Sequence, residues 1–244
     1  MTKLSLFPGR NPEPSAVIRD FAFTTPLGKI LSELAVSGRV LNAAEAAWTG
    51  HLPKEGVTRR WTTAEAVIES VVCRPALIPE YRADLIDCWA VLFRVEALSP
   101  VQSVQLRCGW QDGFNWQDGG PDSGECLAAQ TWWNESTTVS LGSEGGDALL
   151  RRAEAGDWMP ERFREYETEF NELPFCDYTE RGLSIALPSL RTGERVQAHF
   201  VVAWAATVKD SVATWLGVDL DARHILRGAG GEIIWTNDPI TGQS

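Results

Sequence analysis

The sequence has no apolar run that approaches the roughly 20 residues needed to span a bilayer as a helix. Its first residues, 1–11, lack the apolar centre of a secretory signal peptide. Its five cysteines form an odd set without CxxC or zinc-type spacing. We therefore expect reduced thiols, a cytoplasmic location, no membrane partner and no metal site.

Basic residues are too few and too scattered to form a positively charged patch. The formal net charge is −11 and the sequence pI is about 4.8. Because neutralisation of phosphates dominates nucleic-acid affinity, this charge balance excludes nucleic acid as an expected partner. Solubility alone explains the acidity, and a basic protein partner is the alternative explanation.

Compact catalytic motifs are also missing. The three histidines (His51, His199 and His224) form no HExxH or HxH pattern, and there is no GxSxG elbow, P-loop or dinucleotide fingerprint. We therefore expect no cofactor. His199 could serve as a general base, but we expect a hydrogen-bonded structural histidine.

What the sequence does contain is period-2 alternation of apolar and polar residues, which is typical of strands with one solvated face. The clearest strand is 87–97, and its nearness to 104–111 predicts an antiparallel pair. Residues 200–206 are apolar on both faces, so strand 195–206 should be central and covered on both sides. Further strands are predicted at 15–23, 34–40, 61–74, 126–133, 137–141, 183–187, 213–220 and 232–235.

About ten strands at this spacing predict a mainly β fold, an antiparallel β-sandwich or jelly roll. We expect one domain over 1–244, with an extended lead-in at 1–14. A helical insertion is predicted at 142–175, with two short helices near 147–170. Asp147 would cap the first helix and Gly156 would end it. In the second helix, Phe163, Tyr166 and Phe170 would form the buried stripe.

The feature that most suggests function is a tandem hexapeptide, Trp110 to Asn115 followed by Trp116 to Pro121, in which Trp-Gln-Asp-Gly occurs twice. Asp-Gly is a strong turn signal, so we expect a strand, an aromatic and acidic loop, and a second strand. In one interpretation Trp110 and Trp116 stack on a ligand while Asp112 and Asp118 accept hydrogen bonds. In the other, Trp110 closes the core and the Asp-Gly pairs only turn the chain.

The chain has eleven tryptophans, and two of them are adjacent at the end of the following strand. Trp132 and Trp133 must point to opposite faces if extended, so one of them should leave the core. The candidate ligand-binding residues are Trp110, Asp112, Trp116, Asp118, Trp132 and Trp133. The expected ligand is a glycan or another small molecule, and Trp116→Ala should weaken binding while leaving the melting temperature nearly unchanged.

Scattered carboxylates leave an enzymatic alternative. Glu69, Glu96, Glu194 and Glu232 lie in or beside predicted strands, and glycoside hydrolysis needs two acids across a cleft. The sequence selects no particular pair, so the catalytic residues are unassigned. Without a compact motif, the sequence favours a non-catalytic β-sandwich that binds a ligand or protein through the loop at 110–133. The alternative is a carbohydrate-active or small-molecule enzyme.

Overall fold

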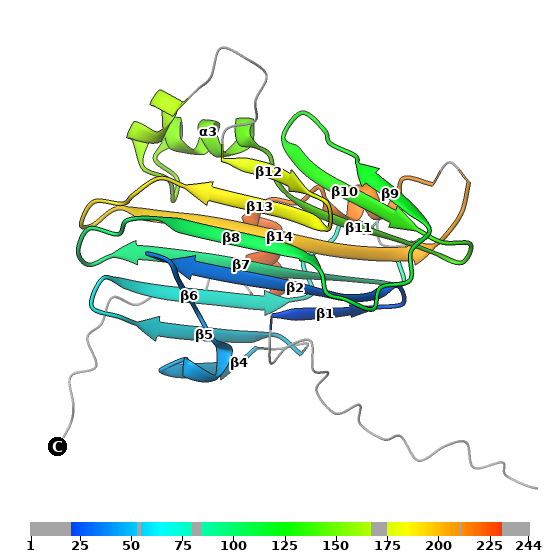
Figure 1. Ribbon diagram of the computed structural model, residues 1–244, viewed down its shortest axis with the longest axis horizontal. Helices are drawn as coiled ribbons and strands as arrows, with labels where there is room; N and C mark the ends of the chain where they lie inside the picture. The colour runs from blue at the N-terminus through cyan, green and yellow to red at the C-terminus, as the bar shows by residue number, and fades with distance from the viewer. Residues whose placement is uncertain (1–20, 53–54, 80–83, 167–174, 210, 231–244) are drawn as a thin grey trace, which may run out of the picture.

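The computed structural model describes residues 21–52, 55–79, 84–166, 175–209 and 211–230. In this part of the chain, fourteen strands form two antiparallel sheets, so the predicted mainly β sandwich is confirmed. Figure 1 shows the strands of both sheets running along the long axis of the molecule. No helix among these residues is long and apolar enough to cross a membrane.

The six-stranded sheet has the order β1-β2-β8-β13-β12, and a short strand, β3, pairs with β2. One of its faces lies against the other sheet, and its other face carries exposed polar side chains. On β8, for example, Val104 and Leu106 are buried while Gln105 and Arg107 are exposed. Its strands are β1 (Ala22–Thr25), β2 (Gly28–Val36), β3 (Arg39–Val40), β8 (Val104–Trp110), β12 (Cys176–Thr179) and β13 (Gly182–Leu187).

The eight-stranded sheet has the order β4-β5-β6-β7-β14-β11-β10-β9. Its inner face and that of the six-stranded sheet enclose the main core, which includes Phe23, Ile30, Leu106, Val139 and Phe200. Its strands are β4 (Trp48–His51), β5 (Val57–Thr62), β6 (Ala66–Cys73), β7 (Asp87–Ala97), β9 (Asp118–Pro121), β10 (Leu127–Trp133), β11 (Thr137–Glu144) and β14 (Arg195–Ala206).

Strand β14 is central and covered on both sides, as predicted. Its inner face joins the main core, while Val201 and Ala203 on its outer face join a second apolar cluster. Two short helices, α4 (Ala213–Val218) and α5 (Ala222–Gly228), contribute the other side of that cluster. The molecule therefore has a third layer over part of the eight-stranded sheet.

The strand predicted at 213–220 is wrong, because this segment forms α4. The buried residues of α4 are Ala213, Thr214, Gly217 and Val218, a spacing that follows one face of a helix rather than alternating along a strand. Gly217 allows the helix to approach the sheet closely, since a Cβ there would lie 3.0 Å from the Ala203 side chain.

The predicted pairing of 87–97 with 104–111 is also wrong. Strand β7 lies between β6 and β14 in the eight-stranded sheet, whereas β8 lies between β2 and β13 in the other. The short connection between them therefore crosses from one sheet to the other. The physical reason lies in their faces: β7 is buried on both faces, while β8 keeps one face in solvent.

The predicted helical insertion is present, as α3 (Gly146–Ala155) and the 3₁₀ helix η2 (Glu161–Tyr166). The N-cap is Gly145 rather than Asp147, and Gly156 ends α3 in the left-handed conformation, with φ of 63°. In η2, Phe163 is buried but Tyr166 is exposed. Phe170, the lead-in at 1–14, the strand at 232–235 and most of the strand at 15–23 lie outside the described residues.

Candidate ligand-binding surfaces

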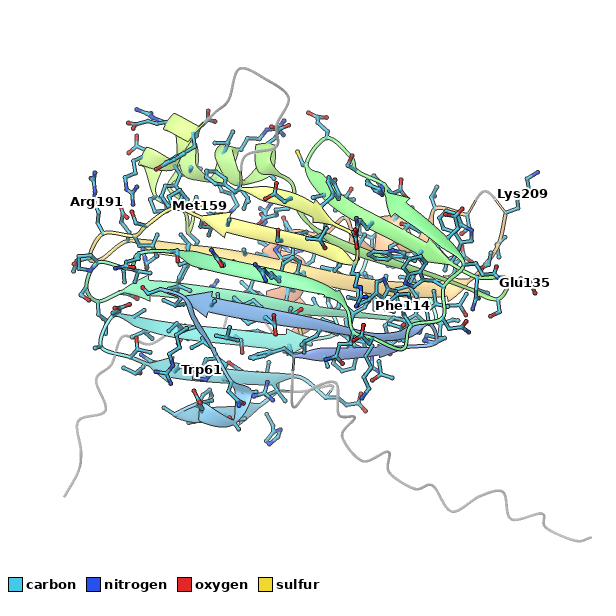
Figure 2. The ribbon with its side chains drawn as sticks, viewed as in Figure 1. Trp61, Phe114, Glu135, Met159, Arg191 and Lys209 are labelled. Atoms are coloured by element: carbon cyan, nitrogen blue, oxygen red, sulfur yellow. The ribbon has the colours of Figure 1, made fainter. Side chains whose placement is uncertain are left out.

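The segment after the first tryptophan of the repeat, residues 111–126, carries the chain from one sheet to the other. It leaves β8 in the six-stranded sheet, forms the edge strand β9, and enters β10 in the eight-stranded sheet. The two Asp-Gly pairs therefore do not make a hairpin between the flanking strands: Gly113 turns the chain with φ of 88°, and Gly119 lies within β9. In Figure 2, Phe114 lies nearer the end of the sandwich that carries Glu135 and Lys209 than the end that carries Arg191.

Two of the predicted ligand residues are core residues. Trp110 and Trp132 are 5% and 2% exposed, and their rings meet edge to face with centroids 5.4 Å apart. The backbone of β9 lies directly against Trp132, since a Cβ added at Gly119 would lie 2.2 Å from its ring. These two tryptophans join the sheets at this end of the molecule and are not available to a ligand.

Trp116 is half-buried and already stacked within the molecule. Its ring lies parallel to that of Phe114, with centroids 4.8 Å apart and planes 10° apart, and both rings pack against the core. Its indole nitrogen is buried without a hydrogen-bond partner. One face of the predicted stacking platform is therefore occupied by Phe114.

Asp112 lies on the exposed side of the same loop and forms an ion pair with Arg181 at 2.6 Å. The Arg181 guanidinium also lies 5.4 Å from the centroid of the Phe114 ring. Arg181 borders a hollow of about 460 Å³ on the outer face of the six-stranded sheet. Most side chains that line this hollow can form hydrogen bonds; they include Glu33, Arg107, Gln111, Thr179 and Ser184.

Asp118 and Trp133 face solvent together on the outer face of the eight-stranded sheet. Asp118 on β9 lies directly opposite Trp133 on β10, which lies directly opposite Thr138 on β11. Trp133 is 39% exposed, so one of the two adjacent tryptophans leaves the core, as predicted. A Cβ added at Gly120, the next outward position on β9, would meet no atom within 4 Å. We call Asp118, Trp133 and Thr138 the Trp133 platform.

Hydrogen bonds hold both sides of the Trp133 platform. The Gly119 amide donates to Asp118 Oδ1 over 2.8 Å, which orients the carboxylate. The Thr138 and Thr207 hydroxyls lie 3.1 Å apart, and Thr207 donates to the Asn134 carbonyl over 2.9 Å. The platform is thus an ordered strip with one exposed indole beside one exposed carboxylate.

Among the candidate acids that the structure describes, Glu69 has a strongly raised pKa. Burial raises its pKa from 4.5 to about 7; Arg60 and Arg94 oppose this rise, and Glu96 adds to it. Glu69 lies between Arg60 and Arg94 in the strand register, and Glu96 is its diagonal neighbour. Glu194 instead forms an ion pair with Arg162 at 2.7 Å, which lowers its pKa. Glu232 lies outside the described residues.

Glu69 should make the stability of the fold depend on pH. Its folded pKa of about 7 exceeds its unfolded value, so its stabilising contribution is present below about pH 4.5 and is lost as the pH rises through 7. After allowance for solvent screening, we expect the wild type to lose about 1–2 kcal/mol more than Glu69→Gln between pH 5 and pH 8. Urea unfolding of both proteins at the two pH values measures this difference. Equal losses would show that Glu69 does not hold its proton in the fold.

His199 is a structural histidine, and its neighbours were not identified from the sequence. It is fully buried, with Nε2 2.8 Å from the Leu220 carbonyl and Nδ1 3.6 Å from Glu144 Oε2. Burial lowers its pKa. Glu144 in turn forms a buried ion pair with Arg152 at 2.6 Å. No sequence motif links these residues, because they come from β14, β11 and α3.

The described residues also bear on metal binding and on thiol chemistry. No group of three or more His, Cys, Asp or Glu residues in this part of the chain is arranged to hold a metal ion. All five cysteines are free thiols, and four of them are buried. Burial raises the pKa of Cys73, Cys108 and Cys176 to about 12, which makes these thiols poor nucleophiles.

Comparison with known proteins adds little. No protein-family model matches the chain, and no curated protein matches it in sequence. One similar solved structure is described as "Putative kojibiose phosphorylase from human microbiome", with a TM-score of 0.40 and 7% identity. The similarity covers 82% of this chain and 24% of that chain, so this chain spans about a quarter of that protein. A similarity of this size supports no argument about function.

Proposed function

We propose that the protein is a non-catalytic β-sandwich that binds a glycan on the Trp133 platform. The observation that supports this proposal is the cross-strand pair of an exposed indole, Trp133, and an exposed carboxylate, Asp118. The C–H face of a sugar ring stacks on a flat aromatic ring, while a carboxylate accepts hydrogen bonds from the hydroxyls at its rim. The open space at Gly120 leaves room for a neighbouring sugar residue.

The platform uses only part of the predicted loop. Trp110 and Trp132 support it from inside the sandwich, and Trp116 is stacked on Phe114. Asp112 forms an ion pair with Arg181, which borders the hollow on the other sheet. Ligand recognition should therefore depend on Trp133 and Asp118 rather than on all six residues selected from the sequence.

The test is a screen of the purified protein on a broad glycan array, followed by titration of any glycan that binds. We expect Trp133→Ala to weaken binding about 30-fold or more, which corresponds to the loss of one binding hot spot of about 2 kcal/mol. The free energy of unfolding of the Trp133→Ala variant should differ from that of the wild type by about 1 kcal/mol or less, because the Trp133 side chain is exposed. Asp118→Asn should weaken binding by a smaller factor.

The matched control is Trp48→Ala. Trp48 is 55% exposed and lies on β4, at the opposite edge of the same sheet. Glycan binding that survives Trp48→Ala and is lost in Trp133→Ala supports the proposal. An array without a specific signal, or equal losses in the two variants, would contradict it. Loss in Arg107→Ala with Trp133→Ala unaffected would instead place the ligand in the hollow on the six-stranded sheet.

A second candidate function is hydrolysis of a glycan by paired carboxylates. The observation in its favour is Glu69, whose pKa of about 7 suits a general acid at neutral pH, with Glu96 as a diagonal neighbour. This function predicts product release from a bound glycan and its loss in Glu69→Gln. Binding of intact glycan without product favours the Trp133 platform alone.

A further inference from the structure

The Trp133 platform continues along β9 beyond the residues that define it. Asp118, Gly120 and Asp122 are alternate residues, so all three face outward on the eight-stranded sheet. Asp122 follows β9 directly, and its amide donates to the Ala129 carbonyl over 2.8 Å, which extends the pairing of β9 with β10. At a rise of about 3.3 Å per residue, Asp118 and Asp122 lie about 13 Å apart, which is longer than one sugar ring.

Hydrogen bonds fix both aspartates at the ends of this strip. Asp122 Oδ2 accepts a hydrogen bond from the Thr131 hydroxyl over 3.2 Å. The Asp122 carbonyl accepts another from the Trp215 indole nitrogen over 2.8 Å, which ties this residue to α4. The Gly119 amide orients the Asp118 carboxylate, as described above. The two carboxylates are therefore ordered groups and not freely rotating side chains.

The elements around these two carboxylates carry no positive charge. From Cys108 to Leu150 the sequence contains seven acidic residues and no lysine or arginine. Strands β9, β10 and β11 lie within this stretch, and α4, which contacts β10 and β11, has no basic residue either. Lys209, which follows β14, projects outward at the end of the sandwich in Figure 2. A ligand that lies along β9 therefore meets carboxylates without a neighbouring cation from these elements.

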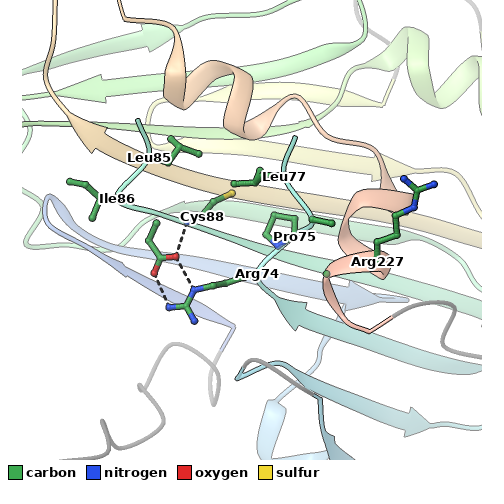
Figure 3. Close-up of a pocket in the computed structure, with 10 residues that line it drawn as sticks. Arg74, Pro75, Leu77, Leu85, Ile86, Cys88 and Arg227 are labelled. Carbon is green, nitrogen blue, oxygen red and sulfur yellow. Dashed lines mark hydrogen bonds and ion pairs between the residues drawn. The ribbon is translucent and has the colours of Figure 1, made fainter. Parts of the chain in front are cut away.

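Several other acids of the protein are neutralised by a basic partner. Figure 3 shows the Asp87 carboxylate joined to the Arg74 guanidinium, through hydrogen bonds of 2.9 and 3.0 Å. Three acids of the stretch without basic residues pair with arginines from outside it: Asp112, Glu125 and Glu144. Within the described part of the chain, neither Asp118 nor Asp122 forms an ion pair. Their negative charges are thus available to a ligand.

We infer that the glycan is an amino-sugar oligosaccharide of at least two residues, whose ammonium groups lie beside Asp118 and Asp122. This inference rests on the glycan-binding function proposed for the Trp133 platform. An ammonium group donates hydrogen bonds and also neutralises a carboxylate, which a neutral hydroxyl does not do. An acidic glycan would instead place like charges together. A single sugar would reach only one of the two carboxylates.

The experiment is titration calorimetry of the full chain at pH 5.5, where the sugar amines are protonated. Four ligands are compared: the chitosan tetramer, its fully N-acetylated counterpart, cellotetraose and glucosamine. We expect the chitosan tetramer to bind about tenfold more tightly than either neutral tetramer, because two exposed ion pairs contribute about threefold each. Glucosamine should bind more weakly than the chitosan tetramer. An increase of the NaCl concentration to about 1 M should remove most of the tenfold advantage.

Variants separate the two aspartates from the aromatic ring. Asp118→Asn and Asp122→Asn should each weaken binding of the chitosan tetramer about threefold, with a smaller effect on the N-acetylated tetramer. The control is Glu33→Gln, which removes an exposed acid from the outer face of the six-stranded sheet. Trp133→Ala should weaken binding of every tetramer. Tetralysine tests charge alone, and we expect its weaker binding to be unaffected by Trp133→Ala.

Tighter binding of the chitosan tetramer that depends on both aspartates supports the inference. The inference is overturned by equal affinity for the cationic and neutral tetramers, by glucosamine binding as tight as that of the chitosan tetramer, or by equal losses in Glu33→Gln and the aspartate variants. If the neutral tetramers bind equally well and lose affinity in Trp133→Ala, the glycan-binding function still holds. Absence of any glycan binding that depends on Trp133 overturns both proposals, so the two failures are distinguishable.

Discussion

Replacing Arg152 by alanine is expected to lower the free energy of unfolding by about 3–5 kcal/mol, the range for breaking a buried ion pair on one side. Arg152 and its partner Glu144 are both largely buried, and they are joined at 2.6 Å. The guanidinium also donates to three backbone carbonyls, those of Asp157, Trp158 and Gln197. Its removal leaves an unpaired carboxylate beside His199 and takes one hydrogen bond from each of the three carbonyls, of which that of Trp158 keeps the Gln197 amide as a donor.

Urea unfolding followed by tryptophan fluorescence measures this loss, with Arg151→Ala as the control. Arg151 is the adjacent residue on α3, but its ion pair with Glu125 is exposed, so we expect a change of about 0.5 kcal/mol or less. Adding Glu144→Gln to Arg152→Ala should recover part of the loss, because the unpaired buried charge is then gone. A loss below about 1 kcal/mol for Arg152→Ala would show that water reaches and solvates Glu144.

The second large effect is expected for Trp132→Ala, which should cost about 3–5 kcal/mol of stability. Trp132 fills the space between Trp110 and the backbone of β9, so its removal leaves a cavity between them. The crossing segment at 111–126 should lose its order with the ring. Loss of unfolding free energy and increased proteolysis within this segment are the measurements.

Trp133→Ala and Trp116→Ala provide graded comparisons for Trp132→Ala. Trp133 is the neighbouring residue and is exposed, so its loss should be small. Trp116 is half-buried and stacked on Phe114, so we expect about 1–2 kcal/mol, in place of the unchanged melting temperature expected from the sequence. Equal losses for Trp132 and Trp133 would contradict the assignment of inner and outer faces on β10.

The strands that could be predicted are those whose residues show period-2 alternation, or a continuous apolar run, over the whole length of the strand. Residues 87–97 and 195–206 alternate or remain apolar over their full length, and the structure gives the same bounds for β7 and β14. Strands β4, β9 and β12 were missed because four residues are too few to establish a period. Helix α4 was misassigned because its apolar residues satisfied both periods over six residues.

The pairing of the strands could not be predicted, because the partner of each strand depends on how all the strands of both sheets pack together. No residue pattern within 87–97 or 104–110 indicates that these two strands belong to different sheets. The candidate site shows the same limit. Alternation established that Trp132 and Trp133 diverge, yet only the neighbours on β9 and β11 decide which one is exposed. The pKa of Glu69 likewise depends on Arg60 and Arg94, which adjoin it only through pairing.

The position of β14 in the eight-stranded sheet has a consequence for how the protein is made. This strand is the last of the described strands in sequence, yet it lies between β7 and β11, and it joins Arg94 to Gln197 across 103 positions of the chain. Until residue 206 leaves the ribosome, β7 and β11 have unpaired apolar edges and the sheet remains in two parts. The sandwich should therefore close only after β14 has been made, and slowly, because its central contacts are far apart in the chain. Chains released before β14 should be substrates for chaperones and proteases rather than smaller folded proteins.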